Sequence, residues 1–92
     1  MLEKRIQIIN KLGLHVRAAT KLVQTASEYD ATISISCNNQ HADAKSIMDV
    51  LMLAAIYQTF VHITVSGENE AEEQKALSKL TALINDRFGE NE

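Results

Sequence analysis

The segment Ala31-Thr32-Ile33-Ser34-Ile35-Ser36-Cys37-Asn38-Asn39 decides the fold class. Between residues 31 and 37 apolar and polar side chains alternate, which places Ile33, Ile35 and Cys37 on one face, as in a half-buried strand. The pair Asn38-Asn39 is favourable for a hairpin turn. The chain then returns as a short strand over about residues 40–44, with two alanines on one face. The segment therefore predicts a β-hairpin that turns one face towards a core.

Two further strands are predicted around this hairpin. Residues 3–9 are rich in isoleucine, with Ile6 and Ile8 on one face, and residues 60–66 alternate again. The apolar positions of the second of these strands are Val61, Ile63 and Val65. The whole chain thus contains four strands that can share one apolar face.

Three helices are predicted between and after the strands. Apolar residues recur at helical spacing over about residues 16–27 and 70–85, and a nearly all-apolar helix is expected over about 47–55. Ser46 precedes that helix as an N-cap, and Asp49 three residues later makes a variant of the capping box. The element order is βαββαβα. Helices on one side of a mostly antiparallel sheet form an α+β open-faced β-sandwich.

Length and composition point to one small domain over residues 1–92. The chain has 92 residues, of which 46% are hydrophobic and 23% charged, and a single cysteine excludes an internal disulfide framework. The longest apolar run, residues 47–57, contains an aspartate and is too short to span a membrane. No apolar segment follows the charged N-terminus as in a signal peptide. We therefore expect a cytoplasmic protein without membrane insertion, with a frayed polar tail over residues 89–92.

Charge is distributed unevenly along the chain. The formal net charge is −3, which argues against nucleic acid as a partner, but residues 1–27 carry five basic side chains and one acidic one. Residues 66–92 carry seven acidic and three basic side chains. The basic first third could meet an anionic group or an acidic protein surface. The alternative is that these charges lie on solvated faces and that their separation along the chain has no functional meaning.

His15 is the candidate functional side chain. It lies where a loop containing Gly13 meets the first predicted helix, whose first N–H groups have no intrahelical partner. These groups and the helix dipole form an anion site, to which Arg17 adds a planar fork suited to phosphate oxygens. They also keep the imidazole neutral and nucleophilic, so the ring could accept a phosphoryl group. A histidine that only caps the helix is the alternative reading.

The remaining candidate residues are read as structural. His41 and His62 occupy outward positions on strands, and no second histidine, cysteine or carboxylate stands at metal-ligand spacing around them. Cys37 ends a strand on its inward face and is expected to be a small buried side chain. We therefore predict no metal site and no cofactor. With no paired acid and base either, we do not expect an enzyme.

The loop and helix start carry a resemblance. Asn10-Lys11-Leu12-Gly13-Leu14-His15-Val16-Arg17-Ala18-Ala19 resembles the active-site signature of the HPr family, the histidine phosphocarriers of the bacterial phosphotransferase system. Lys45-Ser46-Ile47-Met48 is similar to the family's regulatory-serine segment. The resemblance implies four antiparallel strands and three helices. It also implies that Nδ1 of His15 is phosphorylated, that Arg17 stabilises the phosphoryl group, and that Ser46 is a regulatory phosphorylation site.

The resemblance also implies partners. Enzyme I would donate the group from phosphoenolpyruvate, a IIA-type protein would accept it, and an HPr kinase/phosphorylase could act on Ser46. The carrier would be a monomer. The family docks its partners with the first two helices, which implies that the partner-binding residues are Val16, Thr20, Ile47, Met48 and Leu51.

Departures from the family pattern favour one branch. Ala18 stands where proline is usual, and with the Asn10-Lys11-Leu12 lead-in it looks more like NPr, the nitrogen-related branch. Glycines usual after the second helix are replaced within residues 54–58.

The alternatives are a sugar-transport HPr and a non-catalytic regulatory module controlled by Ser46. A ferredoxin-like RNA-binding module would need paired aromatic platforms, which the four aromatic residues do not supply. A small-ligand regulatory domain would need a ligand loop, for which Gly13 alone could serve.

Overall fold

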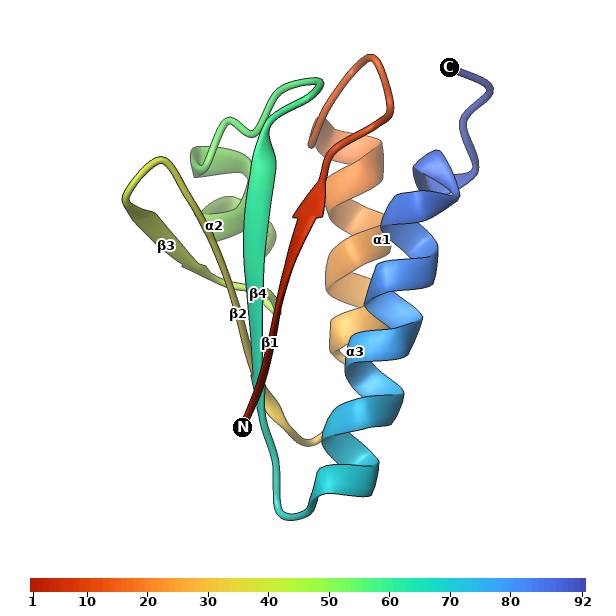
Figure 1. The fold of residues 1–92 in the computed structure, drawn as a ribbon. Coiled ribbons are helices and arrows are strands. Elements are labelled where there is room, and N and C mark those ends of the chain that lie inside the picture. Colours follow the sequence, from red (N-terminus) through yellow and green to blue (C-terminus); the bar gives the residue numbers. More distant parts are fainter.

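The computed structural model describes residues 1–92 as one antiparallel sheet with helices on one face (Figure 1). The sheet has the strand order β1-β4-β2-β3, and β4 pairs with both β1 and β2. The open-faced βαββαβα sandwich predicted from the sequence is confirmed. The elements are β1 (Leu2–Gln7), α1 (Val16–Ala26), β2 (Thr32–Cys37), β3 (Gln40–Asp43), α2 (Ile47–Met52), β4 (Phe60–Ser66), α3 (Glu70–Asn85) and a 3₁₀ turn, η1 (Arg87–Gly89).

The core lies between the sheet and the helices. The alternating positions of β2 and β4 are buried, and Ile35 stands opposite Ile63 across the ladder that joins these strands. The predicted apolar faces of α1 and α3 are buried against them, including Leu22 and Leu80. The alternation and helical spacing of the sequence thus identified the inward faces correctly. No helix of the chain has the length and hydrophobicity that a membrane crossing requires.

The second helix is shorter than its apolar sequence predicts. We expected it to reach about residue 55, but α2 ends at Met52, with Leu53 as its C-cap. Ala54 then adopts a left-handed conformation with φ of 51°. This turn brings the carbonyl of Ala55 to the N–H of Leu14, 2.9 Å away. A tertiary contact between two loops therefore ends the helix one turn early.

Ala54→Gly is expected to stabilise the protein. A left-handed backbone costs a residue with a Cβ about 1–2 kcal/mol, and glycine avoids that cost but loses more entropy on folding. The net gain should be about 0.5–1 kcal/mol, measured as the free energy of unfolding in urea. Ala82→Gly is the matched control, because Ala82 is exposed inside α3, where glycine should destabilise by about 1 kcal/mol. A loss of stability in Ala54→Gly would contradict this account of the turn.

The expectation of a frayed C-terminal tail was wrong. Phe88 is fully buried, with its backbone held at φ of 54°. The Nζ of Lys21 donates to the carbonyl of Phe88 at 2.6 Å, and the N–H of Lys11 donates to a backbone oxygen of Glu92 at 3.1 Å. The tail therefore ends beside the loop between β1 and α1, at the same end of the molecule (Figure 1).

A buried carboxylate links α3 to the start of the chain at the opposite end of the sheet. Glu73 of α3 accepts the N–H of Gly67 at 2.8 Å and pairs with the α-amino group of Met1 at 3.1 Å. These hydrogen bonds hold the pKa of Glu73 below its usual value although burial opposes them. Glu73 is thus a structural carboxylate that ties α3 to the start of the chain.

Candidate functional site

His15 is the N-cap of α1. Its backbone is extended, with φ of −80° and ψ of −179°, and its Nδ1 accepts the backbone N–H of Arg17 at 3.3 Å. The first intrahelical turn closes when Ala19 donates to the carbonyl of His15 at 2.8 Å. The capping reading of His15 is therefore confirmed. It does not compete with the anion site, because the cap places the ring at the positive end of the helix.

A tight loop sets the position of this cap. Gly13 has a φ of +68°, and its N–H donates to the carbonyl of Asn10 at 3.1 Å. A Cβ at Gly13 would lie 2.6 Å from the carbonyl oxygen of Ala55, which is closer than atoms can approach without a shift of the backbone. Glycine is therefore required here for both its conformation and its lack of a side chain.

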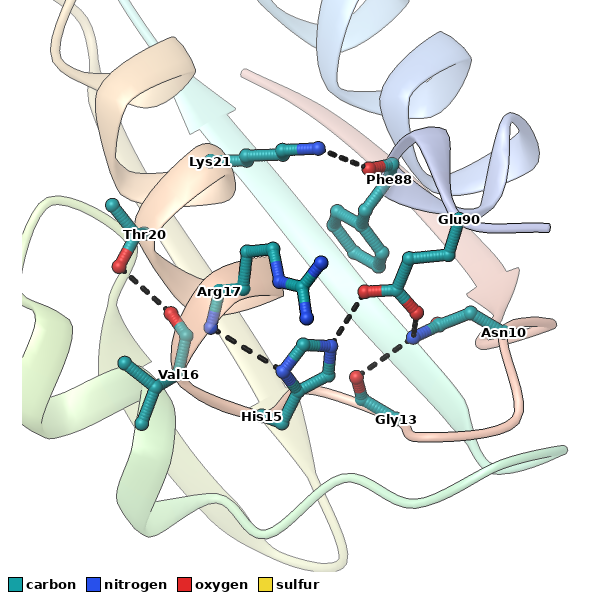
Figure 2. A network of polar contacts seen from close by, with 9 residues as sticks. All are labelled: Asn10, Gly13, His15, Val16, Arg17, Thr20, Lys21, Phe88 and Glu90. Carbon is teal, nitrogen blue, oxygen red and sulfur yellow. Dashed lines mark hydrogen bonds and ion pairs between the residues drawn. The ribbon is translucent and has the colours of Figure 1, made fainter. Parts of the chain in front are cut away.

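A polar network joins the loop, the imidazole and the C-terminal tail (Figure 2). The Nε2 of His15 lies 2.5 Å from Oε2 of Glu90, and Nδ2 of Asn10 donates to Oε1 of the same carboxylate at 3.0 Å. Asn10 is fully buried and also donates to the carbonyl of Gly13 at 2.8 Å. The carbonyl oxygen of its side chain has no partner. Both donors of Asn10 are thus committed to holding the loop and Glu90.

Glu90 was missed by the sequence reasoning. An acidic residue in a short polar tail carries no local signal, since its role depends on the fold of residues 87–89. Asn10 heads the quoted motif and could have been singled out as a polar residue directly after an apolar strand. Its burial became visible only with the contact to the tail.

The electrostatic environment keeps Glu90 ionised. Burial raises the pKa of this carboxyl, but the hydrogen bonds from His15 and Asn10, the charge that His15 carries when protonated, and the charge of Arg17 outweigh it. The pKa of Glu90 therefore lies below its usual value. At neutral pH the carboxylate accepts hydrogen bonds and donates none.

Arg17 extends from the first turn of α1 beside the imidazole. Figure 2 shows its guanidinium next to the ring of His15 and the carboxylate of Glu90. The side chain is exposed and makes no ion pair within the chain. Its donors are therefore available to an anionic ligand at the end of the helix.

Ser46 caps α2 as predicted, but the capping box is incomplete. The Oγ of Ser46 accepts the N–H of Asp49 at 3.3 Å. The carboxylate of Asp49 accepts from the N–H of Asp43 at 3.3 Å instead of from Ser46, whose own N–H donates to the carbonyl of Asp43 at 3.0 Å. The reciprocal bond of a capping box was therefore wrongly expected, because β3 brings a competing N–H donor to the carboxylate.

The proposed partner-binding residues differ in exposure. Val16 and Met48 are 64% and 68% exposed, and Ile47 is 39% exposed. Thr20 is half-buried and donates to the carbonyl of Val16 at 2.7 Å. Leu51 is also half-buried and packs against the core, so its exposed area is the smaller part of its surface.

Further exposed apolar side chains lie on the same elements and on the two loops that meet at Leu14 and Ala55. We refer to the exposed apolar side chains of these helices and loops as the apolar surface: Leu12, Val16, Ile47, Met48, Met52, Ile56 and Tyr57. The loop residues Leu12, Ile56 and Tyr57 were not singled out from the sequence. Large apolar side chains inside loops were the signal that could have found them.

The other candidate residues lie away from this site. Cys37 is buried, as expected, and burial raises the pKa of its thiol. His41 is exposed on β3, and His62 pairs with Glu3 at 2.6 Å on the open face of the sheet. No group of three or more His, Cys, Asp or Glu side chains is placed to hold a metal ion.

Comparison with known proteins assigns the family. The family model described as PTS HPr component phosphorylation site matches residues 2–86. The chain belongs to the HPr family of phosphocarrier proteins. The phosphocarrier protein HPr of Neisseria meningitidis serogroup A is 46% identical over 92 residues, which cover 100% of both chains. The phosphocarrier protein NPr of Shewanella violacea is 42% identical over 90 residues, which cover 97% of this chain and 94% of that protein.

A solved HPr structure confirms the fold. The crystal structure of HPr-C-His from Thermoanaerobacter tengcongensis superposes with a TM-score of 0.86 at 39% identity, with 100% of both chains covered. The site around His15 lies inside the segment that the HPr family model matches, whereas Glu90 lies beyond its last matched residue.

Proposed function

We propose that this HPr-family protein accepts a phosphoryl group on Nδ1 of His15 from enzyme I charged by phosphoenolpyruvate. It then passes the group to a IIA-type acceptor. The observation that carries this proposal is the position of His15 at the N-terminus of α1, with Nδ1 facing the helix N–H groups and the guanidinium of Arg17 beside the ring.

The surroundings of Nδ1 suit a phosphoryl group. The three phosphoryl oxygens can accept the N–H groups at the start of α1, which have no intrahelical partner. Arg17 contributes a charged planar donor set, which forms stronger hydrogen bonds to phosphate than neutral donors do. The imidazole is 24% exposed, so a donor or acceptor protein can reach it.

The apolar surface and the basic first third of the chain support docking of protein partners. Leu12 of the apolar surface lines a pocket with Arg17 and Glu90, and Val16 follows His15 as the first residue of α1, so this surface adjoins the site. Methionines and isoleucine on α2 provide adaptable contact area for more than one partner. Lys11 and Arg17 line a pocket with Glu90 and add positive charge near His15. We propose that enzyme I and the acceptor use this surface in turn and that the carrier acts as a cytoplasmic monomer.

The physiological branch is the finer part of the proposal. Ala18 and the lead-in to His15 favour a nitrogen-related or regulatory phosphotransferase system. The second candidate is a sugar-transport HPr, which the 46% identity to an HPr-named relative favours. These candidates are distinguished by two phosphorylation rates, one with the enzyme I of a nitrogen-related system and one with the enzyme I of a sugar-transport system. A carrier should be phosphorylated fastest by the enzyme I of its own system.

The proposal is tested with phosphoenolpyruvate and enzyme I. We expect the intact mass to increase by one phosphate, and the modification to be labile in acid and stable in base, as a phosphoramidate is. Omission of enzyme I is the control and should give no product. A protein that remains unmodified with every enzyme I tested would contradict the carrier function. The regulatory module controlled by Ser46 would then be the better reading.

Ser46 is proposed as a switch on partner docking. A negative charge at Ser46 gains about 0.3–1 kcal/mol from the start of its own helix, which the neighbouring carboxylates of Asp43 and Asp49 offset. Stability should therefore change little. At the interface the same charge stands beside Ile47 and Met48 and must be desolvated when a partner docks. Ser46→Asp should keep the melting temperature within a few degrees but slow phosphorylation of His15.

Ser46→Ala is the matched control for this switch. It should lose about 1 kcal/mol of capping energy and be phosphorylated on His15 at the parent's rate. The measurement is the rate of His15 phosphorylation against enzyme I concentration for the three proteins. If Ser46→Asp follows the parent over that whole range, Ser46 is only a helix cap.

A further inference from the structure

We propose that Glu90 is a positioning residue for the phosphoryl acceptor. Its carboxylate accepts the Nε2–H of His15 and holds the ring with an unprotonated Nδ1 towards the start of α1. The two atoms are 2.5 Å apart, and the side chains of His15 and Glu90 are 24% and 13% exposed (Figure 2). The proposal rests on the proposed function of His15 and adds a residue from the C-terminal tail to it.

The neighbours of both ring nitrogens specify the same tautomer. An ionised carboxylate only accepts hydrogen bonds, so Nε2 must carry a proton. The backbone N–H of Arg17 only donates, so Nδ1 must present a lone pair. A neutral imidazole has one proton for its two nitrogens, and both contacts place it on Nε2. The nitrogen that faces the helix N-terminus is therefore the nucleophilic one.

The carboxylate is held in place from several sides. Asn10 donates to Oε1 at 3.0 Å, which leaves Oε2 for the imidazole. The tail itself is anchored by the buried ring of Phe88 and by the bond from Lys21 to the carbonyl of Phe88. Gly89 has a φ of +78°, a conformation that glycine adopts without strain and that leads the chain from Phe88 to Glu90. Glu90 is thus part of a folded segment that directs its carboxylate at His15.

The carboxylate of Glu90 also stabilises the positive charge that the imidazole ring gains during phosphoryl transfer. The lone pair of Nδ1 forms a bond to phosphorus, and the donor's leaving atom keeps the electron pair of the bond that breaks. The Nε2 proton stays on the ring, which becomes positively charged while the phosphoryl group remains anionic. Glu90 faces that positive charge through Nε2, whereas Nδ1 faces the start of α1. No proton has to move for the transfer to complete.

Three variants of the C-terminal tail distinguish a positioning role of Glu90 from a contact that only stabilises the fold. Glu90→Ala removes the acceptor. Glu90→Gln retains one acceptor oxygen for two donors, since the second carboxylate oxygen becomes an NH₂ group. Glu92→Gln is the matched control, because Glu92 contacts the loop through a backbone oxygen and its side chain is exposed. The measurements are the ¹⁵N chemical shifts of the neutral His15 ring and the rate of phosphorylation by charged enzyme I.

The expected results distinguish the roles. The parent and Glu92→Gln should show one tautomer with the proton on Nε2, and Glu90→Ala should show averaged shifts of a tautomer mixture. Phosphorylation of Glu90→Ala should be about 10- to 100-fold slower, by analogy with the loss of a group that orients a metal-binding histidine. Glu90→Gln should fall between the two. If Glu90→Ala is phosphorylated at the parent's rate, the proposal is overturned even if the melting temperature drops. The contact between Glu90 and His15 would then only stabilise the fold.

The tautomer measurement needs no phosphoryl donor. If the parent itself takes no phosphate from enzyme I, the proposed function fails, and the ring shifts alone decide about Glu90. Unchanged shifts in Glu90→Ala would then overturn its positioning role. Averaged shifts would support it for whatever reaction His15 performs.

Discussion

His15→Ala is expected to accept no phosphate from charged enzyme I while keeping the parent's fold. Alanine has no nucleophile, and no second histidine lies in the site, since His41 and His62 are on strands of the sheet. The loss should therefore be complete within detection, as measured by intact mass and by incorporation of label from phosphoenolpyruvate. Some stability should be lost as well, because the cap on α1 and the contact to Glu90 both disappear. Loss of an N-cap typically costs about 1 kcal/mol.

Two controls make this result specific. His15→Asn lacks the nucleophile but keeps a side chain favoured at helix N-caps, so it should remain unphosphorylated and be more stable than His15→Ala. His62→Ala removes a histidine that also pairs with a glutamate, on the open face of the sheet, and should be phosphorylated normally. Label on another residue of His15→Ala under the same conditions would rule out His15 as the acceptor.

Arg17→Glu is expected to slow phosphorylation of His15 by about 100-fold or more, comparable with the loss of a charge-stabilising donor in an enzyme active site. The change removes the guanidinium and places a second carboxylate beside Glu90 and the incoming phosphoryl group. Arg17→Lys should be intermediate, because lysine retains the charge but loses the planar fork. The side chain of Arg17 is exposed and unpaired, so neither change should lower the melting temperature by more than a few degrees.

Lys75→Glu is the matched control for the change of net charge. Lys75 is exposed in the first half of α3. That helix begins at the end of the molecule opposite the loop before α1 (Figure 1), and the variant should be phosphorylated at nearly the parent's rate. Rates are measured over a range of enzyme I concentrations, so that weaker docking and slower transfer are resolved. Equal rates for the parent, Arg17→Glu and Arg17→Lys would remove Arg17 from the mechanism.

The sequence determined the sheet, the helices and the location of His15. Alternation in β2 and β4 and helical spacing in α1 and α3 are local patterns, because the side-chain period of each element fixes which residues share a face. The junction of a glycine loop with a helix start is also local, so the order of residues alone places His15 and Arg17 at a helix N-terminus. The family resemblance of residues 10–19 added the chemistry that spacing alone left open.

The tertiary structure alone decided where α2 ends, how the tail folds and what faces the second nitrogen of His15. The end of α2 depends on a contact between Leu14 and Ala55, which lie far apart in the sequence, and no local propensity encodes it. The carboxylate of Glu90 reaches a residue 75 positions away. Burial of Phe88 and two long-range bonds hold the tail there, although its polar sequence predicted fraying. Contacts of this kind depend on the relative placement of several elements, which a period of two or 3.6 residues does not specify.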